Sequence, residues 1–325
     1  MACGTLRALS KSARLGVLAA FVCLAPACER AVEPAAPAPS AAPAGEFDGA
    51  RAFRDLEALV KIGPRAAGSP GAEAARALIR DRLRQAGWVV TAHDFDASLP
   101  DGARVPMTNL LARRGSDSRR RTLLITHYDT KDIPGLAFVG ANDGGSGTAV
   151  LLEVARAIGS DSPPLELVFF DGEEAFGERI DGEDGLYGSR ALAQRMEQDG
   201  SLAEVERVIL VDMVGDADLN LALDMASSAA LRESFEAAAT KLGFPRPFDT
   251  SQAMVVTDDH SPFQERGVET LVLLDFQYGA RTSPGPRWHA AGDTLEGVSA
   301  DSLNRVGRTL VEMLRALPAA RSGAK

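Results

Sequence analysis

The feature that most constrains this chain is a largely apolar run that ends in three carboxylates. Residues 165–170 (LELVFF) are followed at once by Asp171, Glu173 and Glu174. A run of this length and composition predicts a strand that is buried on both faces of a sheet. The carboxylates would then emerge at the C-terminal end of the strand, where open α/β sheets bind their ligands. Because crowded carboxylates repel one another, a site that holds them needs a shared proton or a bound cation.

Helical and strand patterns alternate along the rest of the chain. We expect helices at residues 50–61, 71–86, 147–158 and 300–317, and strands at residues 88–95, 109–113, 123–128, 165–171, 208–213 and 271–275. Such alternation predicts an α/β fold in which helices flank a mixed, mainly parallel central sheet on both faces.

Composition limits the domain count and the partners. With 325 residues and 45% hydrophobic content, the chain can bury one large core, so we expect a single catalytic domain at residues 46–318 and a short tail at 319–325. The net charge of −10, without a Lys/Arg block in the folded part, argues against a nucleic-acid partner.

Residues 1–27 have the pattern of a signal peptide. Arg7, Lys11 and Arg14 precede an apolar segment at 15–24 that is too short to span a membrane, and small residues at 25–27 form a cleavage site. We therefore expect an exported protein. Cys28 follows the cleavage site directly, which leaves two alternatives: a periplasmic or cell-envelope lipoprotein that touches the membrane only through a lipid on this cysteine, or a secreted protein. Residues 28–45, rich in Ala and Pro, predict an extended tether.

Further metal-ligand side chains follow the other predicted strands or lie in loops. They are His127, Asp129, Asp143, Asp212 and His289. All three cysteines lie in or beside the leader, so only carboxylates and imidazoles remain to hold a metal in the domain. Carboxylate oxygen and imidazole nitrogen are ligands of catalytic zinc, and they also accept cobalt or manganese. A phosphate cradle in the Gly-rich turn at 140–147 is disfavoured, because no P-loop ending or dinucleotide spacing is present.

Six ordered motifs resemble one known family. They are residues 126–131 (THYDTK), 138–143 (FVGAND), 169–176 (FFDGEEAF), 186–190 (LYGSR), 258–263 (DDHSPF) and 288–289 (WH). Together they resemble the zinc-dependent glutaminyl cyclase branch of the M28 aminopeptidase superfamily, over about residues 53–314. The resemblance implies the phosphorylase/hydrolase-like, zinc-exopeptidase type of α/β fold.

The resemblance also implies a set of site residues. It makes three residues the ligands of one zinc: Asp143, Glu174 and His289. It makes Glu173 the general acid/base, Asp212 and Asp259 a hydrogen-bonded acidic pair, and Trp288 and Phe176 parts of the substrate pocket. In the implied reaction, zinc polarises the γ-carbonyl of an N-terminal glutamine, and the α-amine of the same peptide attacks it to close a pyroglutamate ring. Glu173 takes the amine proton and returns it to the departing ammonia.

Two other functions fit the same residues. In the peptidase branch, His127 and Asp212 would hold a second zinc, Asp143 would bridge the pair, and Glu173 would activate water to release an N-terminal residue. One zinc is thus expected for a cyclase and two for an aminopeptidase. A catalytically dead peptide-binding module is the third hypothesis. Peptide or protein N-termini are the expected partners in each case.

The chain departs from the cyclase pattern after residue 176. Cyclases usually carry a tryptophan there, whereas residues 177–181 (GERID) contain none, so one aromatic wall of the pocket is missing or replaced. The acidic insert at 178–184 predicts a solvated loop that could repel acidic peptides at the mouth of the site. We expect His260 to be a structural residue and His93 to lie on the surface.

Overall fold

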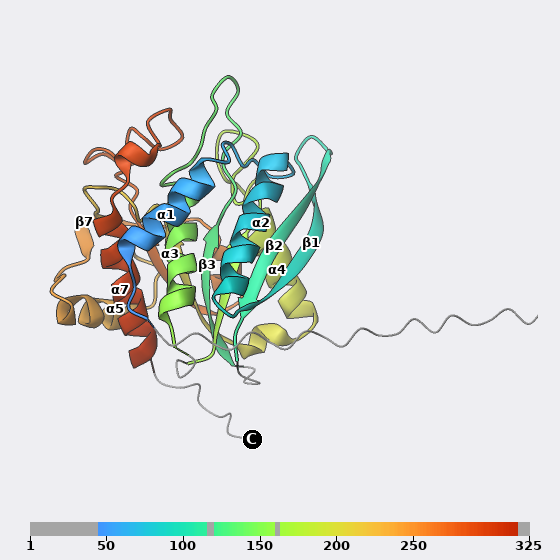
Figure 1. The fold of residues 1–325 in the computed structure, drawn as a ribbon. Helices are drawn as coiled ribbons and strands as arrows, with labels where there is room; N and C mark the ends of the chain where they lie inside the picture. The colour runs from blue at the N-terminus through green and yellow to red at the C-terminus, as the bar shows by residue number, and fades with distance from the viewer. Residues whose placement is uncertain (1–44, 116–119, 160–162, 318–325) are drawn as a thin grey trace, which may run out of the picture. The chain divides into compact units, whose positions relative to one another are not determined.

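The computed structural model describes residues 45–115, 120–159 and 163–317 (Figure 1). The predicted signal peptide, all but the last residue of the tether, and the tail after residue 317 lie outside these residues. A six-stranded sheet forms the centre of the fold, in the order β1-β2-β4-β3-β5-β8. Its strands are β1 (Val89–Ser98), β2 (Arg104–Arg113), β3 (Arg121–His127), β4 (Leu165–Phe170), β5 (Val205–Asp212) and β8 (Glu269–Leu274).

The direction of the strands confirms a mixed, mainly parallel sheet. β1 and β2 form an antiparallel hairpin, and β2 also pairs with β4 in antiparallel fashion. β4, β3, β5 and β8 run parallel to one another. Parallel neighbours end at the same edge of a sheet, so β3, β4 and β5 deliver their C-terminal residues to one place.

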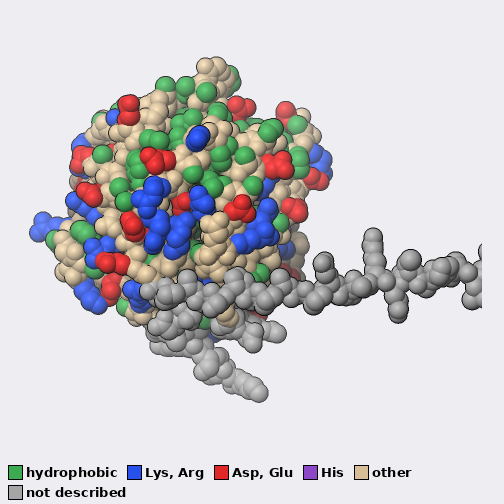
Figure 2. Space-filling view, in the orientation of Figure 1, with side chains coloured by type: hydrophobic (Ala, Val, Ile, Leu, Met, Phe, Trp, Pro, Cys, Tyr) green, Lys and Arg blue, Asp and Glu red, His purple; other side chains and the backbone are tan. Residues whose placement is uncertain are grey.

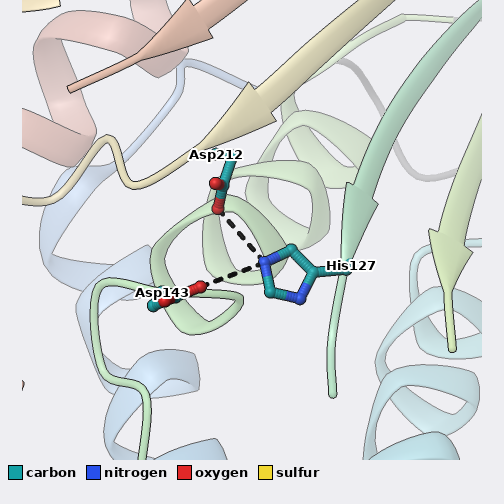
Figure 3. Close-up of side chains that lie close together, drawn as sticks. All are labelled: His127, Asp143 and Asp212. Atoms are coloured by element: carbon teal, nitrogen blue, oxygen red, sulfur yellow. Dashed lines mark ion pairs between the residues drawn. The ribbon is translucent and has the colours of Figure 1, made fainter. Parts of the chain in front are cut away.

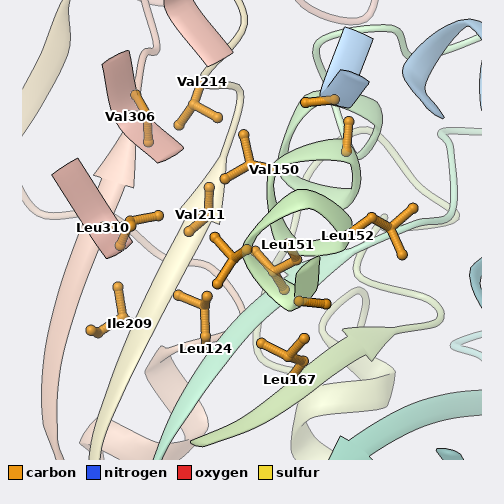
Figure 4. Close-up of a cluster of buried hydrophobic side chains, with 14 of the residues drawn as sticks. Leu124, Val150, Leu151, Leu152, Leu167, Ile209, Val211, Val214, Val306 and Leu310 are labelled. Atoms are coloured by element: carbon orange, nitrogen blue, oxygen red, sulfur yellow. The ribbon is translucent and has the colours of Figure 1, made fainter. Parts of the chain in front are cut away.

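Helices bury both faces of the sheet. α1 (Gly49–Val60), α2 (Pro70–Gln85), α3 (Gly145–Ala157) and α7 (Ala300–Ala316) share one apolar cluster, which Figure 4 shows around α3. α4 (Tyr187–Gln198) and α6 (Ser261–Gln264) contribute to a second cluster. Alternate residues of β3 divide between the two, because Leu124 joins the first and Leu123 and Ile125 join the second. Burial on both faces explains why these strands are nearly continuous apolar runs.

Some elements had no clear sequence signal. β6 (Leu221–Asp224) and β7 (Phe248–Met254) form a separate two-stranded parallel sheet, and α5 (Ala229–Lys241) packs beside α7. Two short 3-10 turns lie at Ser201–Glu204 and Leu295–Gly297. The predicted helices and strands agree with the observed ones to within a few residues. The exception is β2, which begins five residues before its predicted start at residue 109.

The outer side of the helical layer carries charges of both signs (Figure 2). Several of its arginines pair with buried carboxylates: Arg51 and Arg156 with Glu153, and Arg82 and Arg156 with Asp55. These ion pairs connect α1, α2 and α3 at their polar edges. None of the helices in the described ranges is both long enough and apolar enough to span a membrane.

α3 lies so close to the sheet that one position admits only glycine. A Cβ atom built on Gly147 would come closer than 3.0 Å to the carbonyl oxygen of Val211 in β5 and to the hydroxyl of Thr126 in β3. The close approach brings the N-terminal end of α3 and the loop before it over the ends of β3 and β5.

Replacing this glycine should therefore destabilise the protein. Gly147→Ala would gain roughly 1 kcal/mol of helix propensity, but the clash with backbone should outweigh it and cost about 2 kcal/mol or more. Denaturant unfolding measures the difference. Gly182→Ala is the control, because a Cβ there meets nothing within 4 Å, and it should change stability by less than about 0.5 kcal/mol. Equal stability of the two variants would contradict the packing argument.

Candidate active site

The C-terminal ends of three parallel strands assemble the site. β3 ends at His127 and β5 at Asp212, while Glu173 and Glu174 follow the end of β4. β3 lies between β4 and β5 in the sheet. Two further residues arrive on loops: Asp143 immediately before α3, and His289 in the segment between β8 and α7. The predicted convergence of these side chains at one rim is therefore present.

His127, Asp143 and Asp212 form one group of ligand atoms (Figure 3). The Nε2 atom of His127 lies 3.3 Å from an oxygen of Asp143 and 3.3 Å from an oxygen of Asp212. All three side chains are buried.

Asp143, Glu174 and His289 form a second group. The Nε2 atom of His289 lies 3.2 Å from Oε2 of Glu174 and 3.4 Å from Oδ2 of Asp143. Asp143 belongs to both groups and uses a different oxygen in each, Oδ1 toward His127 and Oδ2 toward His289. A carboxylate in this position can bridge two cation sites.

The donor atoms fit zinc. Two ligands that each lie about 2 Å from a tetrahedral ion are about 3.3 Å apart, and the four nitrogen-to-oxygen distances are 3.2–3.4 Å. Several buried atoms in the described part of the chain also have no hydrogen-bond partner, among them both ring nitrogens of His127, Oδ2 of Asp143 and Oδ1 of Asp212. Because buried polar atoms are nearly always satisfied, these orphaned atoms suit metal ligation.

The loop that carries Asp143 is held by glycine and by a second carboxylate. Gly144 has φ +69°, and a Cβ atom there would lie 2.7 Å from the carbonyl oxygen of Asp129 and 2.8 Å from the imidazole of His127. Asp293 accepts hydrogen bonds from the backbone N–H groups of Asn142 (2.7 Å) and Asp143 (3.2 Å). The two features fix the ligand carboxylate close to His127.

Asp129 fixes the backbone of the two glutamates, as Asp293 fixes the backbone of the Asp143 loop. Its carboxylate accepts hydrogen bonds from the backbone N–H groups of Glu173 (3.2 Å) and Glu174 (3.3 Å). Its Oδ1 atom also lies 3.5 Å from Nδ1 of His127, which turns the opposite nitrogen of the ring toward Asp143. Sequence reasoning included Asp129 among the converging ligand candidates, but here it orients the candidate ligands from behind.

Arg65 ties together the loops that carry these residues. Its side chain is fully buried, and its guanidinium donates to the carbonyl oxygens of Tyr128 (2.8 Å), Val139 (2.7 Å) and Gly140 (3.0 Å). Burial lowers its pKa to about 10, while the charge of Asp129 opposes that shift. No pattern in the sequence indicated this role.

Proton affinities at the rim reflect the crowding of charge. Burial alone would lower the pKa of His289, but its contacts with Asp143 and Glu174 raise it to about 10. Burial would likewise raise the pKa of Asp143, but its contacts with the two imidazoles lower it. The pKa of Glu173 is raised well above its ordinary value by burial and by neighbouring carboxylates, against the opposing charge of His127.

A cavity of about 260 Å³ opens beside the ligand groups. Its lining includes Glu173, and Trp288 forms an aromatic wall, stacked on the His289 ring with centroids 4.0 Å apart. Phe276 packs edge-on against Trp288 at 5.2 Å. The remaining lining comes from Lys131, Asp143, Glu174, Arg179, Ile180, Asp212, Met213, Met254, Val255, Val256, Thr257, Asp258, Leu274 and His289. Its volume lies just below the roughly 300–1,000 Å³ of common ligand pockets, so the cavity suits a small ligand or a single side chain.

Several predicted residues lie elsewhere. Phe176 is 39% exposed, contacts Tyr187 and does not line the cavity. Asp171, grouped with the two glutamates at the end of β4, turns away and accepts hydrogen bonds from Arg76 and the backbone of Thr108. Asp171 therefore belongs to neither ligand group, although it follows the same strand as Glu173 and Glu174.

The two aspartates of the 258–263 motif lie differently with respect to the cavity. Asp258 lines the cavity together with Asp212, whereas Asp259 does not. Burial and then the charge of Asp212 raise the pKa of Asp258 well above its ordinary value. Burial raises the pKa of Asp259 to about 7, while Ser189 opposes that shift. The predicted partner of Asp212 was Asp259, whereas its neighbour Asp258 is the residue that lines the cavity.

The other two histidines belong to neither ligand group. His260 is completely buried, and burial lowers its pKa to about 4, so the neutral ring occupies an interior position. His93 is partly exposed in β1, where Nδ1 lies 3.2 Å from the amide nitrogen of Asn109.

The fold and the two linked ligand groups define a class of protein, the α/β metalloproteins of the zinc-exopeptidase type. The family model described as Peptidase family M28 matches residues 109–314. The glutaminyl-peptide cyclotransferase of Bos taurus is 32% identical over 285 residues, which cover 75% of this chain and 76% of that protein. The chain therefore belongs to peptidase family M28, in the branch of the glutaminyl-peptide cyclotransferases.

Solved structures agree with this placement. The glutaminyl cyclase of an Acidobacteriales bacterium is 36% identical, with a TM-score of 0.77 over 86% of this chain and 98% of that one. The glutaminyl cyclase of Porphyromonas gingivalis is 28% identical, with a TM-score of 0.75 over 82% of this chain and 98% of that one. The predicted fold class and family are thus confirmed.

Removing the buried guanidinium should unfold the rim. Arg65→Leu leaves two buried carbonyl groups and one partly buried carbonyl group without their donor. Each unsatisfied buried group costs roughly 1–3 kcal/mol, so we expect a loss of about 3 kcal/mol or more. Denaturant unfolding measures it. Arg54→Leu is the control, because Arg54 lies on the partly exposed side of α1 and should matter little. If Arg65→Leu left the free energy of unfolding unchanged, water would be able to replace the guanidinium.

Zinc binding to the metal-free protein should release protons. A metal binds neutral imidazole, whereas His289 with a pKa of about 10 is protonated at pH 7. Each displaced proton should weaken binding about tenfold for every unit by which pH falls below the pKa. Calorimetric titration in buffers of different ionisation enthalpy counts the protons, and His93→Ala should leave the count unchanged. An affinity that does not vary between pH 6 and pH 8 would contradict the assignment.

Proposed function

We propose that this protein converts N-terminal glutamine of peptides to pyroglutamate and releases ammonia. The observation that carries the proposal is a small cavity in which Glu173 lies beside the ligand group of Asp143, Glu174 and His289. The cavity admits a chain end, and the branch of the family fits the same reaction.

One zinc ion per chain is proposed for the second ligand group. Asp143, Glu174 and His289 would hold this ion, which would supply Lewis-acid polarisation of the γ-carbonyl of the substrate glutamine. Residues of the protein exclude water and transfer the proton. Trp288, which packs against His289 and Phe276, excludes water from one side of the cavity.

Glu173 carries the proton. The α-amine nitrogen forms a bond to the side-chain amide carbon, and Glu173 accepts the proton that this nitrogen loses. The bond from the same carbon to the amide nitrogen then breaks, and Glu173 returns the proton so that ammonia departs. The backbone of Glu173 is held by Asp129, which fixes the carboxyl group at the cavity. Its raised pKa suits a group that must donate as well as accept near neutral pH.

Asp212 and Asp258 form the acidic side of the cavity. Burial and the charge of Asp212 raise the pKa of Asp258 well above its ordinary value, which favours the protonated form of Asp258. A proton on Asp258 reduces the negative charge of this wall, which can still attract the positively charged α-amine. We assign the pair to Asp212 and Asp258 in place of Asp212 and Asp259.

One observation favours a second candidate function. The ligand group of His127, Asp143 and Asp212 is complete, and Asp143 spans both groups, as a two-zinc aminopeptidase would require. A catalytically dead binding module has less support, because both ligand groups and Glu173 are present. Zinc analysis separates these functions: one ion per chain supports the cyclase, two support the aminopeptidase, and none supports the binding module.

We further propose that the protein is exported and that Cys28 carries a lipid or becomes the first residue of a secreted form. The basic, apolar and small-residue segments of residues 1–27 support this proposal.

Incubation with Gln-peptides and with aminoacyl-nitroanilides tests the reaction. Release of ammonia without chain cleavage supports cyclisation, and release of free amino acid or nitroaniline refutes it. Product mass distinguishes the two directly, since cyclisation removes one ammonia from an intact peptide.

Glu173→Gln should lower kcat by about 10²–10⁴, because general acid/base catalysis contributes that much, and should keep its zinc. Steady-state ammonia release and zinc analysis measure the two effects. Glu178→Gln is the matched control, since Glu178 is exposed and does not line the cavity. If Glu173→Gln turned over at the wild-type rate, the proton-carrier role would be excluded.

A further inference from the structure

The loop at residues 177–184 determines the charge at the mouth of the cavity. From sequence, its four acidic residues predicted a mouth that repels acidic peptides. In the structure, Arg179 and Ile180 line the cavity, whereas Glu178, Asp181, Glu183 and Asp184 do not. Arg179 is therefore the one charged residue of this loop that lines the cavity.

Hydrogen bonds occupy two of the acidic side chains of the loop. Asp184 is buried and accepts from the backbone N–H groups of Phe176 (2.8 Å) and Gly177 (2.7 Å) and from the hydroxyl of Tyr187 (2.7 Å). Asp181 accepts from the backbone N–H groups of Glu183 (2.8 Å) and Asp184 (2.9 Å). These bonds fix the turn, so the loop holds Arg179 in a defined place after the two catalytic-site glutamates.

Arg179 is the accessible cation of the cavity lining. The only other lysine or arginine in that lining is Lys131, which is buried and donates to the carbonyl oxygen of Ala175. Arg179 is exposed, and across the described ranges no hydrogen bond or ion pair of its side chain is found. A residue that is both exposed and part of the lining lies at the mouth, and its guanidinium is available to a ligand.

The path of a substrate places its second and third residues at this mouth. The glutamine side chain must reach the ligand group, and its α-amine must reach Glu173, so the peptide leaves the cavity outward. At the mouth it also passes Val255, which lines the cavity although it is 70% exposed. An extended peptide advances about 3.3 Å per residue, which brings the first residues after the glutamine to the rim.

We propose that Arg179 is a specificity residue that binds a carboxylate in one of the two residues after the N-terminal glutamine. The inference rests on the cyclase activity proposed above and names its preferred substrates, peptides with Asp or Glu next to or one residue beyond the glutamine. A guanidinium binds a carboxylate through paired N–H donors. Because the acidic residues of the lining would repel a substrate carboxylate, Arg179 is the residue of the lining that can attract it.

Four C-terminally amidated peptides test the proposal: Gln-Ala-Ala, Gln-Glu-Ala, Gln-Ala-Glu and Gln-Lys-Ala. Ammonia release gives kcat and KM for the wild type and for Arg179→Ala, Arg179→Lys and Arg179→Glu. We expect the wild type to favour one acidic peptide over the neutral one. Arg179→Ala should raise KM for that peptide about fivefold, the effect of a well-formed exposed ion pair, with kcat and the neutral peptide unchanged. Arg179→Lys should restore part of the preference, and Arg179→Glu should invert it toward Gln-Lys-Ala.

A matched control separates charge from loop structure. Arg190 donates to the backbone carbonyl of Asp181 but does not line the cavity. Arg190→Ala should therefore affect all four peptides by the same factor. Added salt should reduce the acidic preference of the wild type, because exposed charges are screened.

The remaining outcomes distinguish a failure of the Arg179 specificity role from a failure of the cyclase activity. If the wild type releases ammonia from the neutral peptide but shows no acidic preference, or if Arg179→Ala changes all peptides alike, the specificity role is refuted and the cyclase activity stands. If no Gln-peptide yields ammonia, both proposals fail.

Discussion

Buried negative charge at one end of the sheet is the constraint on which the rest of the site depends. Asp143, Glu173, Glu174, Asp212 and Asp258 all lie at or near the floor of one small cavity. In a medium of low dielectric constant their repulsion would be large, so the fold requires positive charge among them. Two imidazoles and the cation that they can bind provide it. The metal is thus as much a condition for assembling this rim as a tool for its chemistry.

The supporting structure is built mainly from contacts to backbone. Asp129 accepts hydrogen bonds from the backbone N–H groups of the two glutamates. Asp293 does the same for the backbone N–H groups of Asn142 and Asp143. Arg65 donates to three backbone carbonyl groups. Charged side chains at these places bind the peptide groups of the ligand loops while the ligand side chains stay free. That arrangement explains how irregular loops, which usually vary in position, can hold metal ligands with the accuracy that catalysis needs.

Elements with a regular hydrophobic period were predictable from the sequence, whereas most features that depend on loops were not. Buried parallel strands appear as apolar runs, so the ends of β3, β4 and β5 were predictable, and with them His127, Glu174 and Asp212. The polar β7 (FDTSQAM) has no such signal, and β6 is only four residues long. Arg65 binds carbonyl groups that are 63 to 75 positions away along the chain. In the irregular segment before α6, no periodicity distinguishes Asp258 from Asp259, and the resemblance alone did not settle which carboxylate faces the cavity.

Charge balance also explains how one rim can serve two reactions in the same family. The group of His127, Asp143 and Asp212 is as complete as the group that includes His289. His127 is fully buried, and carboxylates on its sides raise its pKa well above the ordinary value despite burial. A proton on this imidazole would supply one positive charge among Asp129, Asp143 and Asp212, where a peptidase would place its second zinc. Together with the single zinc ion proposed above, this proton would balance the negative charge of the rim.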